Sequence, residues 1–336
     1  MLLERRGDHT VSHPKLANLI GPIAAVVTLG CLSGSSAAQA QPDAEVLDES
    51  LWGAGTDEAV GSTIVFTKLS ENQGQNEVLV AEIYAMDPGG SNQRRITTNT
   101  TFDLFAELSP DGKTVAFDKN LGGIRTITLV DIDGSNERLL TSGQFPSWSP
   151  DGSQLAFNAP GAGGLGDIWV INVDGTGLTN ITQTSWGDSR PDFSPNGQKI
   201  AYTSSRTGNP EIWVMNADGT NPVQITDHPA ADAAPDWSPN GQKILFQSTR
   251  DDPQQDIYVI DNKGVHRLTT SAGRDLDPNW SPTGQQIAFD SDRNFISEQM
   301  RQIFIMNSDG SDQHPITFPP HEDAHAAWGH GHSNEY

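Results

Sequence analysis

One stretch of about a dozen residues recurs along the chain and constrains its architecture more than any other feature. Its fullest copy runs from Pro235 to Phe246 and reads Pro-Asp-Trp-Ser-Pro-Asn-Gly-Gln-Lys-Ile-Leu-Phe. The Ser-Pro pair returns at intervals of 40, 45, 44 and 43 residues, at Ser109, Ser149, Ser194, Ser238 and Ser281. A fixed period of this length indicates a repeat protein, and a repeat of four strands builds one blade of a β-propeller.

Each repeat contains four short apolar runs, named a to d here in chain order. In the fourth repeat these runs are 191–194, 199–203, 211–215 and 222–226. Runs of about five residues rich in β-branched and aromatic side chains are typical of strands. Pro195-Asn-Gly197 provides an a–b turn and Ala217-Asp-Gly219 a c–d turn, because Gly adopts positive φ without cost. Each repeat is therefore predicted to be an antiparallel meander.

Counting each strand type separately gives the number of blades. The b strands are marked by Phe66, Phe117, Phe157, Tyr202, Phe246 and Phe289. The c strands are marked by Ile83, Ile127, Ile168, Ile212, Ile257 and Ile303, and the d strands by Thr97, Thr141, Thr182, Thr226, Thr269 and Thr317. Only five Ser-Pro strands accompany them, and 326–329 (Ala-Ala-Trp-Gly) falls where a sixth would be. We predict an all-β, six-bladed propeller in which this C-terminal strand completes the first blade and removes the open edges.

The N-terminal part of the chain reads as an export signal. Arg5, Arg6 and Lys15 precede an apolar run over 16–32, and Ala38-Gln-Ala40 forms an A-x-A cleavage pattern. Residues 1–40 are therefore interpreted as a signal peptide, 41–61 as an acidic linker or extended arm, and 62–336 as the propeller. Two alternatives stay open: a twin-arginine signal, and lipidation at Cys31 in a Thr-Leu-Gly-Cys sequence.

Charge narrows the partners that we expect. The formal net charge of −23 disfavours nucleic acid and anionic membrane surfaces as partners. No segment beyond the signal is apolar enough to cross a bilayer. If cleavage follows Ala40, the mature chain has no cysteine and needs no disulfide. We expect an exported, periplasmic or secreted monomer that binds a protein or a cell-envelope component.

The repeats resemble the TolB-type, WD40-like (PD40) propeller family. The resemblance rests on 188–206 (Asp-Ser-Arg-Pro-Asp-Phe-Ser-Pro-Asn-Gly-Gln-Lys-Ile-Ala-Tyr-Thr-Ser-Ser-Arg), on 212–219 and on their copies, and it covers residues 62 to 329. It implies the fold strongly and the function weakly, since propellers are scaffolds. TolB itself is periplasmic and has an extra N-terminal domain that binds partner proteins; residues 41–61 are too few for that domain. Other relatives carry a serine peptidase domain or a metal-dependent pectate-fragment lyase site, and neither is visible in this sequence.

The direction of the strands sorts the loops onto two faces. The a–b and c–d turns share one face and are all tight, whereas the b–c loops and d–a links share the other. The second face, named the loop-rich face here, has all the length variation, at 67–79, 159–166 and 292–302. Variable loops on a rigid frame often carry function, although loop length also drifts without function.

An acidic set is predicted on the same face. Six residues before the Ser-Pro serine, or its C-terminal equivalent, stand Asp103, Asp188, Asp232, Asp275 and Asp323. Four residues after the b-strand aromatic stand Arg206, Arg250 and Arg293. We expect the Asp residues to ring the central opening and the Arg residues to pair with them, within a blade or between blades, as structural locks. Asp103 has no Arg partner in either register, and we hypothesise that it binds a cation or a partner's Lys or Arg.

The sequence His321-Glu-Asp-Ala-His325 matches the H-E-x-x-H motif of zinc peptidases. That motif needs a helix, which places both His on one side of the metal. Here Pro319 and Pro320 precede it and a predicted inner strand follows, so we expect no zincin site and regard His321 and His325 only as weak metal candidates. No G-x-S-x-G elbow, Walker loop or dinucleotide fingerprint occurs, and the Asp-Gly turns lack the remaining ligands of a calcium loop.

Three functions remain open. The first is a non-enzymatic scaffold that binds its partner on the loop-rich face, without catalytic residues and with no cofactor beyond a divalent cation at the central mouth. The second is a metal-dependent carbohydrate lyase or hydrolase at that mouth. The third is a regulatory propeller that works with a separate peptidase. A cluster of His and carboxylate side chains converging in the channel would favour the second.

Overall fold

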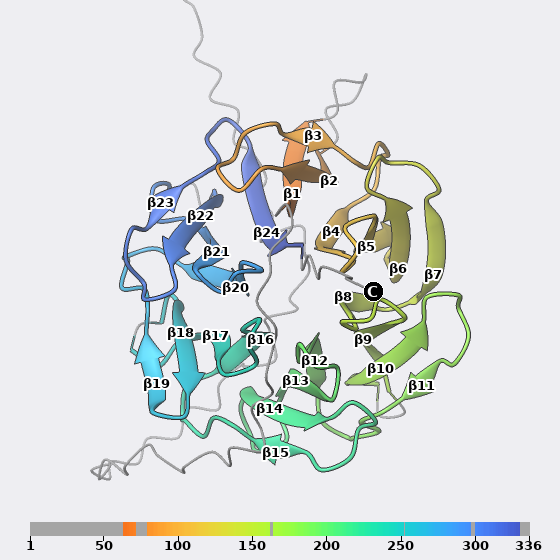
Figure 1. The fold of residues 1–336 in the computed structure, drawn as a ribbon, viewed down its shortest axis with the longest axis vertical. Helices are drawn as coiled ribbons and strands as arrows, with labels where there is room; N and C mark the ends of the chain where they lie inside the picture. Colours follow the sequence, from red (N-terminus) through yellow and green to blue (C-terminus); the bar gives the residue numbers. More distant parts are fainter. Residues whose placement is uncertain (1–62, 72–78, 162–163, 252, 297–299, 330–336) are drawn as a thin grey trace, which may run out of the picture.

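The computed structural model describes residues 63–71, 79–161, 164–251, 253–296 and 300–329 (Figure 1). The signal peptide, Cys31 and the acidic linker lie outside the described residues and stay predictions. The strands form six four-stranded sheets arranged as a ring around a central channel. The six-bladed propeller predicted from the repeat is confirmed.

Each blade is a sheet whose inner strand lines the channel. Blade 1 consists of β24 (Glu322–Trp328), β1 (Ile64–Glu71), β2 (Leu79–Met86) and β3 (Arg94–Arg95). Blade 2 consists of β4 (Asp103–Leu108), β5 (Thr114–Leu121), β6 (Ile124–Asp131) and β7 (Arg138–Ser142). Blade 3 consists of β8 (Gln144–Trp148), β9 (Gln154–Pro160), β10 (Gly166–Asn172) and β11 (Thr179–Asn180).

The second half of the ring repeats this order. Blade 4 consists of β12 (Asp188–Phe193), β13 (Lys199–Ser204), β14 (Glu211–Asn216) and β15 (Val223–Gln224). Blade 5 consists of β16 (Asp232–Trp237), β17 (Ile244–Ser248), β18 (Asp256–Asp261) and β19 (Gly264–Arg267). Blade 6 consists of β20 (Asp275–Trp280), β21 (Gln286–Ser291), β22 (Gln302–Asn307) and β23 (His314–Pro315).

The C-terminal strand closes the ring, as predicted. β24 runs antiparallel to β1, with Ile64 opposite Trp328 and Val65 opposite Ala327. Trp328 is 1% exposed. Blade 1 is thus assembled from the two ends of the described chain.

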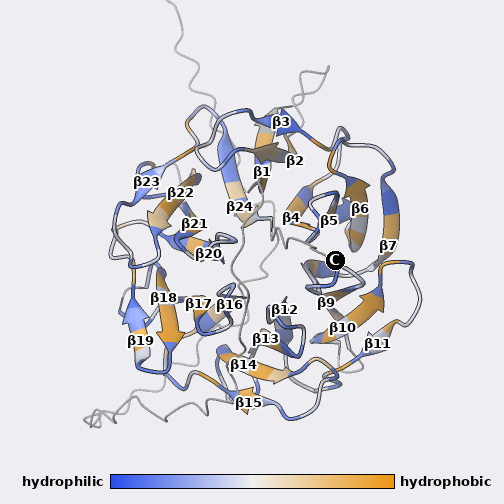
Figure 2. Ribbon diagram, in the orientation of Figure 1, coloured by the Kyte–Doolittle hydropathy of each residue, from blue (hydrophilic) through white to orange (hydrophobic). Residues whose placement is uncertain are grey.

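The hydrophobic core lies between neighbouring blades. All six b-strand aromatic residues and all six c-strand Ile markers are buried. Phe66 of blade 1, for example, packs in one cluster with Ala288 and Ile303 of blade 6. Middle strands such as β10 and β18 are hydrophobic in Figure 2, whereas the outer strands β19 and β23 are hydrophilic. Each blade therefore buries both faces against its neighbours and leaves its outer edge to solvent.

Four of the six d strands, namely β3, β11, β15 and β23, comprise only two residues each and are shorter than the sequence suggests. We predict 222–226 as one strand, but β15 comprises only Val223 and Gln224. Beyond it, the backbone N–H of Ile212 donates to the Thr226 Oγ1 atom (3.0 Å) rather than to a backbone carbonyl. The d-strand Thr makes the same contact at Thr97, Thr182, Thr269 and Thr317. A side chain therefore completes the hydrogen bonding of the c strand where the regular ladder ends.

Every inner strand contains a bulge that the sequence pattern does not reveal. In β12 the pairing with β13 shifts by one residue between Ser189 and Asp192. The fourth residue before the Ser-Pro serine, or its C-terminal equivalent, has φ between +48° and +56° in all six strands. We name these the bulge residues: Phe105, Phe145, Arg190, Ala234, Asp277 and His325. Non-glycine residues rarely take such φ values, and clusters of them often mark functional sites.

Candidate functional site in the central channel

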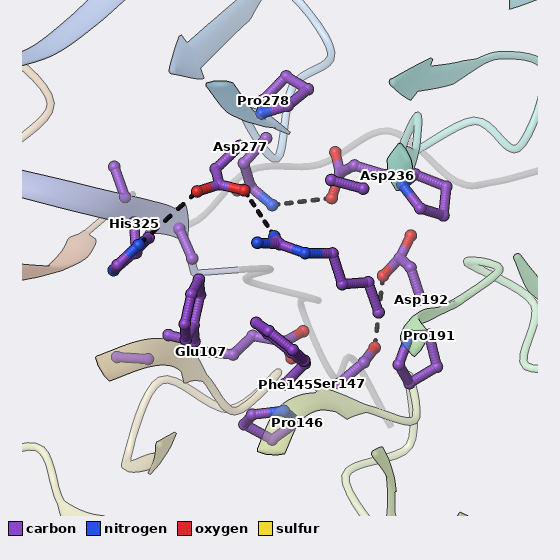
Figure 3. A pocket seen from close by; sticks show the side chains of 18 residues that line it. Glu107, Phe145, Pro146, Ser147, Pro191, Asp192, Asp236, Asp277, Pro278 and His325 are labelled. Carbon is purple, nitrogen blue, oxygen red and sulfur yellow. Dashed lines mark hydrogen bonds and ion pairs between the residues drawn. The ribbon is translucent and has the colours of Figure 1, made fainter. Parts of the chain in front are cut away.

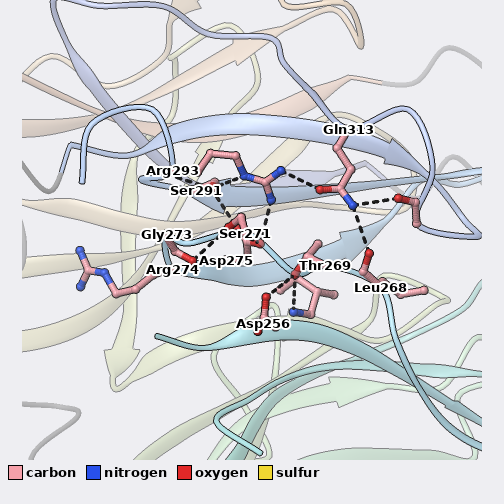
Figure 4. A network of polar contacts seen from close by, with 12 residues as sticks. Asp256, Leu268, Thr269, Ser271, Gly273, Arg274, Asp275, Ser291, Arg293 and Gln313 are labelled. Atoms are coloured by element: carbon pink, nitrogen blue, oxygen red, sulfur yellow. Dashed lines mark hydrogen bonds and ion pairs between the residues drawn. The ribbon is translucent and has the colours of Figure 1, made fainter. Parts of the chain in front are cut away.

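The predicted Asp and Arg residues pair within their own blades. The Arg–Asp nitrogen–oxygen distance is 3.4 Å for Arg206–Asp188, 2.6 Å for Arg250–Asp232 and 2.7 Å for Arg293–Asp275. All three carboxylates are fully buried. Figure 4 shows the blade 6 pair, where Arg293 also donates to Ser291 and Gln313. These contacts join the loop after the b strand to the start of the a strand.

Aromatic rings hold each of these arginines in place. The Arg206 guanidinium lies 4.4 Å from the centre of the Trp213 ring and 5.5 Å from that of Tyr202. Arg250 and Arg293 are enclosed in the same way by Phe246 with Tyr258 and by Phe289 with Phe304. A guanidinium between rings gains cation–π attraction and is shielded from water. The geometry is that of a structural lock repeated in three blades.

The two remaining carboxylates have other partners. Asp323 lies 3.9 Å from the Lys68 ammonium group, and burial raises its pKa to about 7. Asp103 accepts hydrogen bonds from the Asn99 amide (2.7 Å) and the Thr101 hydroxyl (3.0 Å), and burial raises its pKa as well. Within the described part of the chain Asp103 therefore has no Arg partner, and its oxygens accept hydrogen bonds inside the blade.

None of these five Asp residues lines the central cavity, although we expect them to ring the opening. The bulge explains the difference. In an unbroken strand, the sixth and the second residue before the serine would point to the same face. The extra residue of the bulge reverses this relation, so the Asp side chains turn into the blade. Ligand binding by Asp103, Asp188, Asp232, Asp275 or Asp323 stays a prediction.

The cavity in the channel, of about 130 Å³, is lined instead by the bulge residues and by the residues two positions further along (Figure 3). Arg190 crosses the channel from β12 to β20, where its Nη1 atom lies 2.5 Å from Asp277 Oδ1. Its guanidinium also lies 5.1 Å and 4.5 Å from the ring centres of Phe105 and Phe145. Five of the six bulge residues thus form one connected group, since the His325 ring lies 3.8 Å from that of Phe105.

A second set of side chains in the cavity ties five of the six inner strands to the next one around the ring. Each of them accepts a hydrogen bond from the backbone N–H of the following blade's inner strand, at 2.6–3.3 Å. We name them the latch residues: Glu107, Ser147, Asp192, Asp236 and Asn279. Since the three acidic members also face the cavity, they combine a structural role with ionisable carboxyl groups in the channel.

The acidic latch residues are costly to ionise. Burial raises the pKa of Asp192 to about 7, even though the Trp237 N–H and the Ser147 hydroxyl favour its charged form. Burial also raises the pKa values of Glu107 and Asp236 well above the usual range, and the charge of Asp192 adds to both shifts. A cation placed beside these three carboxyl groups would favour their ionised form.

A His and two carboxylates converge at one side of this cavity. Asp277, Asp290 and His325 each offer a ligand atom, and these atoms lie within 4.8 Å of one another. His325 lies in β24 and not in a helix, so the H-E-x-x-H motif has no zincin geometry, as predicted. His321 precedes that strand, and His325 alone of the two reaches the cavity.

Among the described residues, no helix is long and apolar enough to cross a membrane.

Comparisons with known proteins agree with this fold. Residues 223–333 match the PD40 family, described as the TolB beta propeller domain, and residues 164–264 match the tricorn protease N-terminal beta propeller domain. A TolB homologue from Chlorobium luteolum is 32% identical over 157 residues, which are 45% of this chain and 33% of the homologue. An uncharacterized protein from Agrobacterium fabrum is 33% identical over 126 residues, 36% of this chain and 42% of that protein.

Solved structures extend the match to most of the ring. The crystal structure of TolB from Acinetobacter baumannii has a TM-score of 0.70 at 21% identity and covers 80% of this chain and 66% of its own. The described part of this chain has the fold of a TolB-like β-propeller. An oligogalacturonate lyase in complex with manganese is more distant, with a TM-score of 0.51 at 17% identity and 70% of each chain covered. Similarity at these identities shows the fold alone.

The sequence pattern did not identify the residues that line the channel. The repeat nevertheless contains a signal for them. At the bulge position, the six copies have Phe, Phe, Arg, Ala, Asp and His, whereas the neighbouring Ser-Pro and Asp positions hardly vary. A position that has a different type of side chain in almost every repeat does not have the same structural role in all six blades. Aligning the six copies would thus have directed attention to the channel.

Proposed function

We propose that this TolB-type propeller is an exported, non-enzymatic scaffold that binds a protein or a cell-envelope component on its loop-rich face. The similarity to TolB homologues supports a protein-binding role in general. Because the matched segments span only about a third to two fifths of the curated relatives, their partners are not transferred to this chain. The signal-like residues 1–40 support a periplasmic or secreted location.

We choose the loop-rich face as the binding surface because most of the exposed apolar side chains lie toward it. Nine large hydrophobic side chains of the described residues are exposed. Six of them lie toward the loop-rich face, at the adjoining ends of β5 and β6, in b–c loops or in d–a links: Leu121, Ile124, Leu165, Trp186, Ile296 and Phe318. Trp186, between blades 3 and 4, is 50% exposed, and Phe318, between blades 6 and 1, is 65% exposed. Exposed aromatic residues on the face of a rigid frame can serve as separate anchors for a protein partner.

The proposal predicts that truncating these aromatics removes partner binding and leaves the fold intact. The mature chain and the double variant Trp186→Ser/Phe318→Ser are used to capture partners from an envelope extract of the native host. The dissociation constant of the captured partner is then measured with purified components. We expect at least a tenfold weaker affinity, because buried interface aromatics often contribute about 2 kcal/mol or more each.

The matched control is Leu139→Ser/Leu178→Ser, which removes two exposed apolar side chains from outer strand β7 and the c–d turn of blade 3. This variant should bind like the unaltered chain. Equal weakening by both double variants, or by neither, would contradict the proposed face. The convergence of Asp277, Asp290 and His325 in the channel supports the carbohydrate-active alternative. Metal-dependent cleavage of a polysaccharide, unaffected by either double variant, would favour that alternative over the scaffold.

A further inference from the structure

The convergence of Asp277, Asp290 and His325 brings together three strands of two blades. His325 lies in β24 of blade 1, and the two Asp residues lie in β20 and β21 of blade 6. His325 Nε2 is 3.8 Å from Asp277 Oδ2, too long for a hydrogen bond between the two side chains. Ligand atoms that surround one metal ion without touching each other have spacings of this kind, given metal–ligand distances of about 2.0–2.2 Å.

Two side-chain atoms of the group have no hydrogen-bond partner within the described part of the chain. They are Asp290 Oδ1 and His325 Nδ1, and both are buried. Nδ1 is the ring nitrogen other than the Nε2 atom that lies beside Asp277. His325 is 5% exposed and Asp290 is fully buried. An unpaired buried carboxylate oxygen is unfavourable, and a metal ion at Asp290 Oδ1 would satisfy it.

Arg190 and Arg301 each contact one oxygen of a carboxylate in the group, on the side away from the other ligand atoms. Arg190 contacts Asp277 through Oδ1, which leaves Oδ2 on the side of His325. Arg301 lies 3.3 Å from Asp290 Oδ2, which also accepts the His325 backbone N–H at 2.8 Å. Asp290 Oδ1 is thereby left over. Hydrogen-bonded carboxylates with one oxygen held and the other available are a usual arrangement around protein-bound metals.

Carboxyl groups surround the cavity. Five of them line or back it: Glu107, Asp192, Asp236, Asp277 and Asp290. Arg190 contacts Asp277, and Arg301 contacts both Asp290 and Glu322. A metal ion bound among buried carboxyl groups would lower the cost of ionising them.

Blade 2 shows that the backbone contact alone does not require this cluster. There Asp118 Oδ1 accepts the N–H of bulge residue Phe145 at 2.7 Å, and Arg125 lies 3.8 Å from its other oxygen. Asp118 is thus the counterpart of Asp290, with a Phe in the place of His325. The imidazole and Asp277 are additions specific to the junction of blades 6 and 1.

We propose that Asp277, Asp290 and His325 form a binding site for a divalent first-row transition metal ion, reached from the central cavity. One imidazole and two carboxylates suit Zn²⁺ or Mn²⁺, and water from the cavity would complete the coordination. The site does not depend on the proposed scaffold function.

Zinc binding is measured by isothermal titration calorimetry on the untagged mature chain. His330→Gln/His332→Gln is the background for all variants, so that the C-terminal histidines do not contribute. We expect one Zn²⁺ per chain, and at least tenfold weaker binding in His325→Phe and in Asp290→Asn. Phe already occupies the bulge position in blades 2 and 3, which makes His325→Phe compatible with the fold.

The matched control is Asp118→Asn, which alters the equivalent contact in blade 2 and should bind Zn²⁺ normally. The absence of stoichiometric binding in the background chain, or equal affinity in His325→Phe, would overturn the proposal. So would a loss in Asp118→Asn as large as that in Asp290→Asn, because the effect would then belong to the fold.

A second measurement does not rely on these substitutions. X-ray absorption at the zinc edge reports the ligands in the background chain. We expect one imidazole together with oxygen ligands. A spectrum with no imidazole, or with two or more, would place the ion elsewhere and contradict the site.

Discussion

Single residues show how far a repeat pattern predicts contacts and where it stops. The pairing of Arg206, Arg250 and Arg293 with Asp residues followed from their fixed positions in the repeat, and the structure selects the pairing within each blade. The position of the Asp residues did not follow, because it depends on a bulge. His325 is the opposite case: the sequence singled it out through a motif that needs a helix, and its actual neighbours, Asp277 and Asp290, come from another blade.

A comparison of Asp232 with Asp103 tests the structural role of the Asp–Arg pairs. Asp232→Asn leaves the enclosed Arg250 without its buried counter-charge, and we expect the free energy of unfolding to fall by about 3–5 kcal/mol. Asp103→Asn disturbs hydrogen bonds from the neutral Asn99 and Thr101 side chains and a charge interaction with Lys119 that is not a direct ion pair, with a loss of about 1 kcal/mol. Urea denaturation of both variants checks this. A larger loss in Asp103→Asn would show that Asp103, not the Arg pair, is the structural residue.

At the level of the strands, periodicity predicted the elements and missed their irregularities. The four runs of each repeat, their turns and their antiparallel order are confirmed. The bulge is invisible to such an analysis because Phe105, Arg190 or Ala234 carries no turn signal, and its geometry comes from the contact with the neighbouring blade. The bulge N–H of Ala234, for instance, donates to Thr203 of blade 4. Tertiary contacts of this kind cannot be read from a single repeat.

The latches between inner strands predict a dependence of stability on pH. Asp192 has a pKa of about 7 in the folded state, against about 3.9 for an unperturbed Asp. Between these values the folded protein binds the proton and the unfolded chain does not. The contribution of Asp192 to stability is therefore complete below about pH 4 and is lost as the pH rises towards 7.

Asp192→Asn, which cannot titrate, isolates this contribution. The free energy of unfolding, measured by urea denaturation from pH 4 to 8, should decline less steeply with rising pH in the variant. Asp218→Asn serves as control, since Asp218 is exposed in a c–d turn and its pKa is lowered by Thr220. Parallel pH profiles of Asp192→Asn and the unaltered chain would show that Asp192 does not carry the effect.

At the level of the whole molecule, the sequence determined both the number of blades and the way the ring closes. Counting three strand types at six and the fourth at five left one consistent arrangement, and β24 occupies it. The number of blades did not predict which residues line the channel. The lining depends on contacts between residues of different repeats, which come from blades that are not adjacent in the ring. Arg190 and Asp277, for example, are 87 residues apart in the chain and in contact across the cavity.

Closure of the ring predicts that the last strand stabilises the whole domain. Deleting 324–336 removes most of β24, including the buried side chains of Ala324, Ala326 and Trp328, and leaves β1 with an open edge. Truncation of one buried Trp alone costs about 3–5 kcal/mol, so we expect the melting temperature to fall by more than about 10 °C, in a single transition. Deleting only 330–336 keeps β24 and should leave the melting temperature unchanged. The melting temperatures of both truncated chains are measured by calorimetry. An unaltered melting temperature without β24 would mean that the open ring is stable. A separate transition at low temperature would mean that blade 1 unfolds by itself.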